Sequence, residues 1–232
     1  MSEVLSRIRE AAAKASAGPL ADARERPAFP RVAARSPFPP ETTLRDLVDR
    51  FRLELEALAG SAYGPFDASG VAGKVTEILS DRNISRLLAW DAGQIECPGL
   101  AERLGHARIE LIHGDVPVDG GHRESLDRLA QLEIGLSGAI AGLADTGSII
   151  VASGPGRARV ASLLPPVHIA VLSTAQLVPT MHDWLVAAGA ELARSVANLV
   201  VITGCSRTAD IELKPILGMH GPKELHVVLY QP

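Results

Sequence analysis

The feature that most constrains the fold is an alternation, between residues 85 and 230, of short apolar runs with helical or turn-rich segments. Each run has the length of a buried strand and is too short for a helix of its own. Strands separated by helices usually pair in parallel, and the helices cover the sheet. We therefore predict an α/β domain with a mainly parallel sheet, whose strands are "SRLLAW" (85–90), "ARIELIH" (107–113), "QLEIGLS" (131–137), "GSIIVAS" (147–153), "VHIAVLS" (167–173), "NLVVITG" (198–204) and "ELHVVLY" (224–230).

The first forty residues have a different character. Apolar residues at helical spacing predict a short helix over 4–15, and residues 18–40 hold six of the sixteen prolines. Proline lacks a backbone N–H and cannot pair inside a sheet. The sequence therefore predicts a helix and an extended arm over 1–40, followed by the globular domain over 41–232.

A longer helix is predicted to open this domain, over "TTLRDLVDRFRLELEALAG" (42–60). Thr42 or Thr43 is available as the N-cap, and Gly60 follows the last apolar residue, as glycine does at many helix ends. The apolar face consists of Leu44, Leu47, Val48, Phe51, Leu55 and Leu58.

Composition argues against several classes of partner. A formal charge of −4, a pI near 6.0 and an aromatic content of 3% leave neither a basic field nor stacking platforms for nucleic acid. Glu3, Arg7 and Arg9 interrupt the N-terminus before a signal peptide forms, and no later apolar stretch has membrane-spanning length. We expect a soluble cytoplasmic protein that binds neither nucleic acid nor a membrane.

The cysteines exclude further chemistry. Cys97 and Cys205 lie far apart in the chain, so there is no CxxC pair, no zinc site of four thiolates and no ligand set for an iron–sulphur cluster. The expected cytoplasmic compartment favours two reduced thiols over a disulfide. We predict that the chain binds no metal and no resident cofactor.

In open α/β sheets, ligands usually bind beyond the carboxyl ends of the strands, so the turns are the places to search for function. In "LADTGSIIV", Asp145, Thr146 and Ser148 can orient a polar ligand while Gly147 allows it to approach the backbone. The alternative, favoured on this stretch alone, is that Gly147 ends a helix and Asp145 is a solvated acid in its last turn.

A second candidate turn is "ASGPGRARV". Gly154 and Gly156 expose backbone amides, and Arg157 supplies paired donors that suit a phosphate or a carboxylate. A glycine turn with basic surface residues explains the stretch equally well. His168, on an apolar strand, is interpreted as a hydrogen-bonded structural residue, and the adjacent His182 and Asp183 need not form a pair.

The third stretch, "ITGCSRTADIE" (202–212), is the strongest candidate. If 198–202 is a strand and a helix begins near Arg207 or Thr208, the amides after Gly204 and the helix dipole point toward a ligand above the strand. Ser206 then caps that helix or donates to the ligand. Candidate catalytic groups nearby are Asp210, Glu212 and His220, although a capped helix followed by a surface loop is the plain alternative.

Four stretches, "AIAGLADTGSIIV", "SLLPPVHIAVL", "ITGCSRTADIE" and "MHGPKELHVVLY", resemble in order and spacing the motif blocks of the LUD-domain family, which includes lactate utilisation protein C. The resemblance is close over 123–232 and looser over 70–122. It implies a three-layer α/β/α fold like that of the NagB, ribose-phosphate isomerase and CoA-transferase group. Asp145 stands where glutamate is common in the family, and Cys205 where proline is usual.

The resemblance leads to two functional hypotheses. The first is a subunit or assembly factor that supports oxidation of L-lactate to pyruvate beside iron–sulphur partner proteins, with a small anion held among the turns 145–148, 154–157 and 204–208. The second is an independent enzyme of the isomerase, CoA-transferase or folate-cycloligase type, acting on a phosphorylated or CoA-linked substrate. Asp145, Asp210 or Glu212 would then be its acid, base or nucleophile. A homo-oligomer formed through the N-terminal arm is a further option.

Overall fold

The computed structural model describes residues 37–114, 122–209, 215–217 and 221–232, with the backbone alone for 122, 188–190, 193–194, 207–209 and 215–217. The predicted helix over 4–15 and nearly all of the proline-rich arm lie outside these ranges, as do Asp210, Glu212 and His220.

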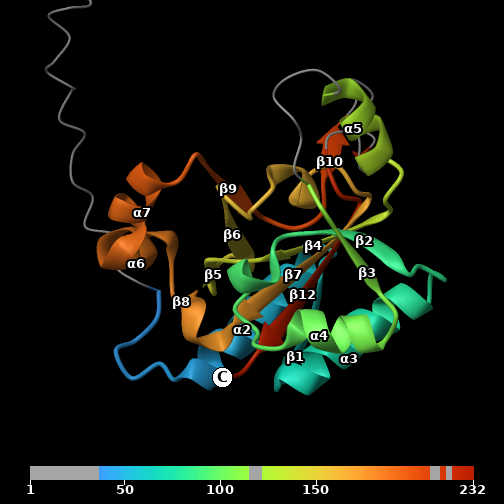
Figure 1. Ribbon diagram of the computed structural model, residues 1–232. Coiled ribbons are helices and arrows are strands. Elements are labelled where there is room, and N and C mark those ends of the chain that lie inside the picture. Colours follow the sequence, from blue (N-terminus) through green and yellow to red (C-terminus); the bar gives the residue numbers. More distant parts are fainter. Residues whose placement is uncertain (1–36, 115–121, 210–214, 218–220) are drawn as a thin grey trace, which may run out of the picture. The chain divides into compact units, whose positions relative to one another are not determined.

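A parallel six-stranded sheet forms the centre of the domain (Figure 1). Its order is β1-β12-β7-β4-β2-β3, and every neighbouring pair is parallel. The predicted α/β class with a mainly parallel sheet is confirmed, and five of the predicted runs lie in this sheet, whereas β1 was not predicted. The strands are β1 (Ser61–Phe66), β2 (Arg86–Ala89), β3 (Glu110–His113), β4 (Ile134–Gly138), β7 (Val167–Ser173) and β12 (Glu224–Tyr230).

The other two predicted strands belong to a second sheet of order β8-β5-β6-β9. β6 pairs antiparallel with both β5 and β9, so the prediction of one largely parallel set is wrong for these two runs. For β5 and β6 the reason is the connection: a four-residue turn joins them, whereas parallel neighbours need a crossover of about a dozen residues. β9 then pairs with the other edge of β6. The strands are β5 (Ala141–Leu143), β6 (Ser148–Ser153), β8 (Leu177–Val178) and β9 (Asn198–Ile202).

The helix predicted to begin near Arg207 is also wrong. Residues Arg207–Ala209 form strand β10, which pairs antiparallel with β11 (Pro215–Leu217). The segment carries no apolar stripe at helical spacing, and Thr208 is β-branched, so local preference for a helix is weak. Backbone pairing with residues 215–217 therefore decides its conformation.

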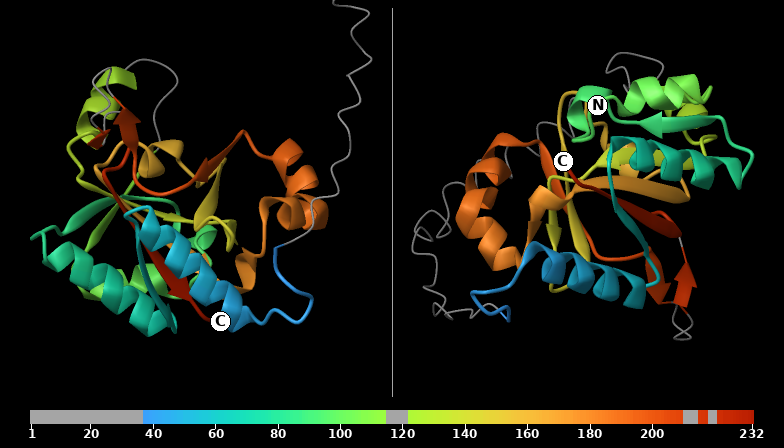
Figure 2. Two further views of the ribbon diagram at one scale, coloured as in Figure 1. Left: turned by 180° about the vertical axis from the view of Figure 1, so that it is seen from behind. Right: turned by 90° about the horizontal axis from the view of Figure 1, so that it is seen from below.

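The helices are divided between the faces of the main sheet. α3 and α4 pack side by side on one face, and α2 lies on the opposite side (Figure 2). None of the helices in the described ranges is long and apolar enough to cross a membrane. The α-helices are α2 (Leu44–Ala57), α3 (Ala68–Ser80), α4 (Leu100–His106), α5 (His122–Leu129), α6 (Met181–Trp184) and α7 (Ala190–Ser195); the 3-10 turns are η2 (Ala92–Gln94), η3 (Arg159–Ser162) and η4 (Thr174–Gln176), and η5 (Leu185–Gly189) is π-helical.

α2 confirms the helix predicted over 42–60 and selects its cap. Thr43 is the N-cap, in a reciprocal capping box with Asp46. Phe51 and Leu55 are fully buried, but Leu44 is 48% exposed, because the first turn extends beyond the core. The predicted face is therefore apolar but not buried throughout.

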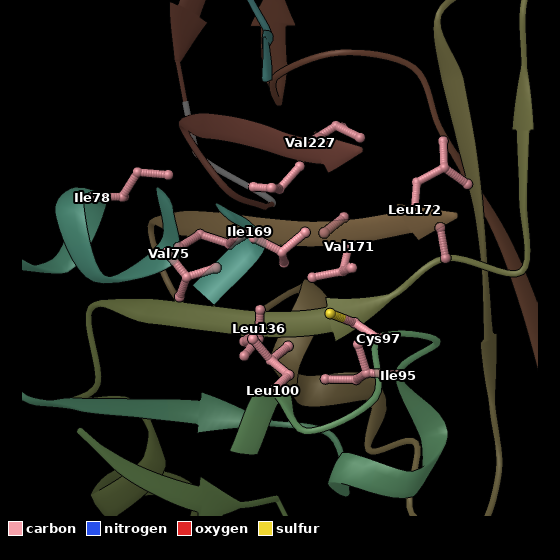
Figure 3. Packing of buried hydrophobic residues seen from close by; sticks show 14 of the residues in the cluster. Val75, Ile78, Ile95, Cys97, Leu100, Leu136, Ile169, Val171, Leu172 and Val227 are labelled. Carbon is pink, nitrogen blue, oxygen red and sulfur yellow. The ribbon is translucent and has the colours of Figure 1, made fainter. Parts of the chain in front are cut away.

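The main core occupies both faces of the sheet, since buried residues of α2 belong to the same cluster as those under α3 and α4, some of which Figure 3 shows. Val75 and Ile78 of α3 face Ile169 of β7, and Ile95 and Cys97 lie beside Leu136 of β4. Leu136 and Ile169 are register partners on adjacent parallel strands, so they point to the same face. This packing holds the carboxyl ends of the central strands in a rigid frame.

Candidate functional site

The turn 154–157 is the predicted element that lies at the carboxyl end of the parallel sheet. Gly154 and Arg157 are joined by backbone hydrogen bonds in both directions, of 2.9 and 3.3 Å, and Gly156 has φ +69°. Pro155 at the second position and a left-handed glycine at the third is the pattern of a type II turn. The turn therefore presents Arg157 in a fixed orientation.

Backbone bonds attach this turn to the residues that follow β2. The Asp91 N–H donates to the Gly156 carbonyl at 2.9 Å, and the Trp90 ring N–H donates to the Ala158 carbonyl at 3.2 Å. A Cβ on Gly156 would lie 2.7 Å from Asp91 Oδ2. The left-handed backbone favours glycine at this position, and the exposed Asp91 carboxylate would have to turn aside for a larger residue.

Arg157 is held from two sides. Its Nε donates to Gln94 Oε1 at 2.8 Å, and its guanidinium lies 5.8 Å from the Trp90 ring centroid. Within the described ranges it forms no ion pair with an acidic side chain. A guanidinium has five N–H donors, so the remaining groups of this half-buried arginine suit a carboxylate or phosphate.

An acid and a histidine lie next to this arginine turn. Asp91 follows β2 and His113 ends β3, and Asp91 Oδ1 is 3.0 Å from His113 Nδ1. Their side chains are 55% and 45% exposed, so both reach solvent. A carboxylate on one imidazole nitrogen orients the ring and leaves Nε2 to exchange a proton with a ligand.

Sequence reasoning missed four members of this group: Trp90, Asp91, Gln94 and His113. The available signal was their position directly after, or at the end of, predicted strands. The connection after β2 leads to β3 at the edge of the sheet, whereas the connection after β4 leads to β7 in the opposite direction. A topological switch point therefore lies between the neighbouring strands β2 and β4. Ligands in open α/β sheets usually bind at such a point. We call Trp90, Asp91, Gln94, His113 and Arg157, with the turn 154–157, the carboxyl-edge cluster.

The turn 145–148 lies at the other end of β6 from the turn 154–157, about 17 Å away at a rise of about 3.3 Å per residue. The structure therefore does not bring the predicted binding turns together around one small anion. Ser148 is buried, and its hydroxyl bonds to Thr146 Oγ1 and Thr203 Oγ1, each at 2.8 Å. The Ser148 hydroxyl thus uses its hydrogen bonds to connect the start of β6 to the residue that follows β9.

The charges around Asp145 also differ from those expected around a bound anion. Burial raises the pKa of Asp145, the Thr146 hydroxyl opposes this, and the carboxylates of Asp183 and Glu54 raise it further. A region dominated by carboxylates repels an anion. Thr146, Gly147 and Ser148 therefore receive no support here as anion ligands, whereas a carboxyl with a raised pKa remains a candidate acid.

Two of the predicted ligand-binding glycines have a packing explanation. Gly147 does not end a helix; it closes the β5–β6 hairpin with φ +61°, and a Cβ there would lie 2.2 Å from the Leu55 backbone nitrogen. Gly204 has φ +78°, and its Cβ would lie 2.7 Å from Leu58 Cβ. Both glycines bring β-strand ends against α2.

Of the remaining predicted binding residues, two line a cavity and two are described by their backbone alone. Gly204 and Ser206 line a small cavity near His168, which is fully buried and bonds to Ser137 Oγ at 2.8 Å as its structural interpretation predicts. For Arg207 and Thr208 the backbone strand is described and the side chains are not. Thr180 is the N-cap of α6: its hydroxyl accepts from the Asp183 N–H and donates to Asp183 Oδ2, and Asp183 forms no pair with His182 in the described part of the chain.

Both cysteines are free. Cys97 is buried, and burial raises the pKa of its thiol, while the Cys205 thiol donates to the Ala59 carbonyl at 3.1 Å. Among the described His, Cys, Asp and Glu side chains, no group of three or more is arranged to hold a metal ion.

Comparison with known proteins identifies a family. Residues 48–230 match the LUD domain. The chain is 33% identical over 153 residues to the uncharacterized protein NMB1437 of Neisseria meningitidis, an alignment that covers 65% of this chain and 62% of that protein. It is 30% identical over 156 residues to lactate utilization protein C of Halalkalibacterium halodurans, covering 64% of each. The chain thus spans just under two thirds of these relatives.

A solved structure supports the fold. The crystal structure of a DUF162 family protein from Deinococcus radiodurans superposes with a TM-score of 0.59 at 20% identity, covering 82% of this chain and 99% of that one. At this identity the likeness shows the fold alone.

Proposed function

The chain belongs to the LUD domain family, and on that premise we propose that it supports the oxidation of L-lactate to pyruvate by binding a small carboxylate at the carboxyl-edge cluster. Relatives named lactate utilization protein C, from Halalkalibacterium halodurans and Geobacillus, support the lactate-utilisation part of this proposal. The site part rests on the geometry around Arg157.

The observation that carries the proposal is a half-buried arginine that is oriented but not neutralised. Gln94 and Trp90 fix the guanidinium, and no ion pair to it is formed within the described ranges. A carboxylate completes such a site with paired, charge-assisted hydrogen bonds. Asp91 connects the arginine turn to His113, so a hydroxy or oxo group on the same ligand would face a proton-exchanging imidazole.

The redox chemistry is assigned to partner proteins. Iron–sulphur clusters are held mainly by about four cysteine thiolates, and this chain has two cysteines, of which Cys97 is buried in the core. Under this proposal, iron–sulphur partners accept the electrons, while this chain presents or retains the organic acid. The proposed carboxylate ligand is small and anionic, as the first sequence hypothesis requires.

A binding experiment tests the site. L-lactate and pyruvate are titrated separately into the full chain, and the amide signals of Gly154 and Gly156 are followed by NMR. Arg157→Ala is expected to weaken binding about 10- to 100-fold, because a charged hydrogen bond contributes about 1.5–3 kcal/mol. Arg159→Ala is the matched control, since Arg159 is exposed two residues away. Equal affinities in the two variants, or no response to either acid, would refute the site.

A growth experiment tests the biological role. Deletion of the gene in its own organism is expected to impair growth on L-lactate as sole carbon source while leaving growth on glucose unchanged. Reintroduced wild-type chain and Arg159→Ala should restore growth on lactate, and Arg157→Ala should not. Undiminished growth of the deletion strain on lactate contradicts the role, whatever the binding experiment shows.

The Asp91–His113 pair favours a second candidate function, an independent enzyme related to the NagB, ribose-phosphate isomerase and CoA-transferase group. A carboxylate-oriented imidazole beside an anion-binding arginine suits proton transfer on a phosphorylated or CoA-linked substrate. Asp145, with its raised pKa, is the alternative acid at the other end of β6. Turnover of a sugar phosphate or a CoA ester by the isolated chain, abolished by His113→Gln, would favour this function over the first.

A further inference from the structure

A small cavity lies between the main sheet and β9, away from the carboxyl-edge cluster. Its volume is about 180 Å³, and its wall includes His168 and Leu225, which are register partners near the amino ends of β7 and β12. The wall also includes Ile202 of β9 and Ser206, whose N–H donates to the Pro222 carbonyl at 2.9 Å. Strand pairing and a backbone hydrogen bond thus connect segments distant in sequence around the cavity.

His168 is the unusual member of this wall. The residue is fully buried, its Nε2 bonds to Ser137 Oγ at 2.8 Å, and its Nδ1 has no hydrogen-bond partner among the residues that the structure describes. Buried polar atoms are nearly always paired, and each exception calls for an explanation such as an unseen ligand. A neutral imidazole offers either a donor or an acceptor at Nδ1, depending on its tautomer.

The charge of the cavity limits what it can hold. Burial, with a smaller contribution from His226, lowers the pKa of His168 to about 4, so the imidazole is neutral at pH 7. No Lys, Arg, Asp or Glu is among the residues that the structure places around the cavity. An ion in this space would lose its hydration without gaining a counter-charge from those residues. The volume accommodates roughly six non-hydrogen atoms, at about 30 Å³ for each water-sized unit.

We propose that this cavity binds a small uncharged molecule whose hydroxyl, carbonyl or amide group hydrogen-bonds to Nδ1 of His168, while its carbon atoms contact Leu163, Ile202 and Leu225. This ligand class differs from the carboxylate assigned to Arg157, so the cavity is a second binding site. Val201, which is 40% exposed, and Gly221 also line the cavity.

The test uses three neutral probes, lactamide, propanamide and 2-propanol, with lactate as the charged counterpart of lactamide. Amide signals of Gly204, Ser206 and Gly221 report this cavity, and those of Gly154 and Gly156 report the carboxyl-edge cluster. At least one neutral probe is expected to shift the first group saturably, with a dissociation constant in the millimolar range for a ligand of this size. Lactate should leave that group unshifted. No saturable shift with any neutral probe, or a shift with lactate alone, overturns the proposal.

Variants separate the cavity from its surroundings. Leu163→Trp enlarges a half-buried side chain of the cavity wall and should weaken probe binding at least tenfold, whereas Leu164→Trp, at the next position, exposed and outside that wall, should leave it unchanged. His168→Phe removes the polar atom and should abolish binding. Because loss of the Ser137 bond can disturb folding, Leu163→Trp is decisive: unchanged binding in that variant overturns the proposal.

Discussion

Replacing Gly147 by alanine should destabilise the domain strongly without affecting any ligand. Gly147 has φ +61°, and a Cβ there would lie 2.2 Å from the Leu55 nitrogen and 2.7 Å from the Glu54 carbonyl carbon. These atoms belong to the backbone of α2, which cannot move aside as a flexible side chain would. Either the hairpin or the helix must shift.

The magnitude follows from two costs. A non-glycine residue in the left-handed region costs about 1–2 kcal/mol, and overpacking a well-packed interior costs about 1–3 kcal/mol. The free energy of unfolding should therefore fall by about 2–5 kcal/mol. For a domain of this size, each kcal/mol lowers Tm by about 2–4 °C, so Tm should fall by between about 4 and 20 °C.

Urea unfolding followed by circular dichroism measures the difference, with Gly154→Ala as the control. A Cβ on Gly154 would meet no atom within 4 Å, so that variant should retain nearly the wild-type free energy of unfolding. If Gly147→Ala lies within about 0.5 kcal/mol of Gly154→Ala, a difference no larger than that of an ordinary surface substitution, the packing explanation is wrong. The hypothesis that Gly147 allows a ligand to approach the backbone would then be favoured.

Three further predictions follow from the hydrogen bonds and burial. Thr43→Ala should lower the free energy of unfolding by about 1 kcal/mol through loss of the N-cap, whereas Thr42→Ala should cost less, as measured by urea unfolding. The pKa of His168 is about 4 in the folded chain and 6.5 in the unfolded chain, so the unfolded chain binds more protons between these two pH values. The free energy of unfolding should therefore fall by about 2 kcal/mol from pH 7 to pH 5, and His168→Phe should lack this fall. A thiol reagent should modify Cys205 faster than Cys97 in the native chain, because Cys97 is 3% exposed and burial raises the pKa of its thiol; equal rates would contradict this.

Comparison of β6 and β7 shows how far sequence patterns reach. Both are continuous apolar runs, and both were predicted as strands, since a short apolar run between turn signals is typical of a buried strand. Their apolar character does not reveal which neighbour each will pair with. β7 joins the parallel sheet, whereas β6 joins a mixed sheet in which both of its own pairings are antiparallel. The short β5–β6 turn and its packing against α2 make that choice.

The candidate site shows the same division. Arg157 was predicted as an anion-binding residue from its glycine turn, and that prediction now stands as part of a proposal. Its setting depends on Trp90, Gln94 and Asp91, which lie more than sixty residues earlier in the chain. No local pattern contains such a pairing, because it arises only when the turn after β6 meets the residues that follow β2.

By itself, the sequence determined seven of the strands, the α2 helix and the LUD-domain resemblance, because apolar runs, capping residues and ordered motifs are local properties. Only the tertiary structure decided that β6 and β9 form a second sheet, that residues 207–209 extend as a strand, and that Gly147 and Gly204 pack on α2. It also decided that the turns 145–148 and 154–157 lie at opposite ends of one strand. The physical reason is that sheet partners and side-chain surroundings depend on contacts between distant segments, whose energies outweigh the weak local preferences of short stretches.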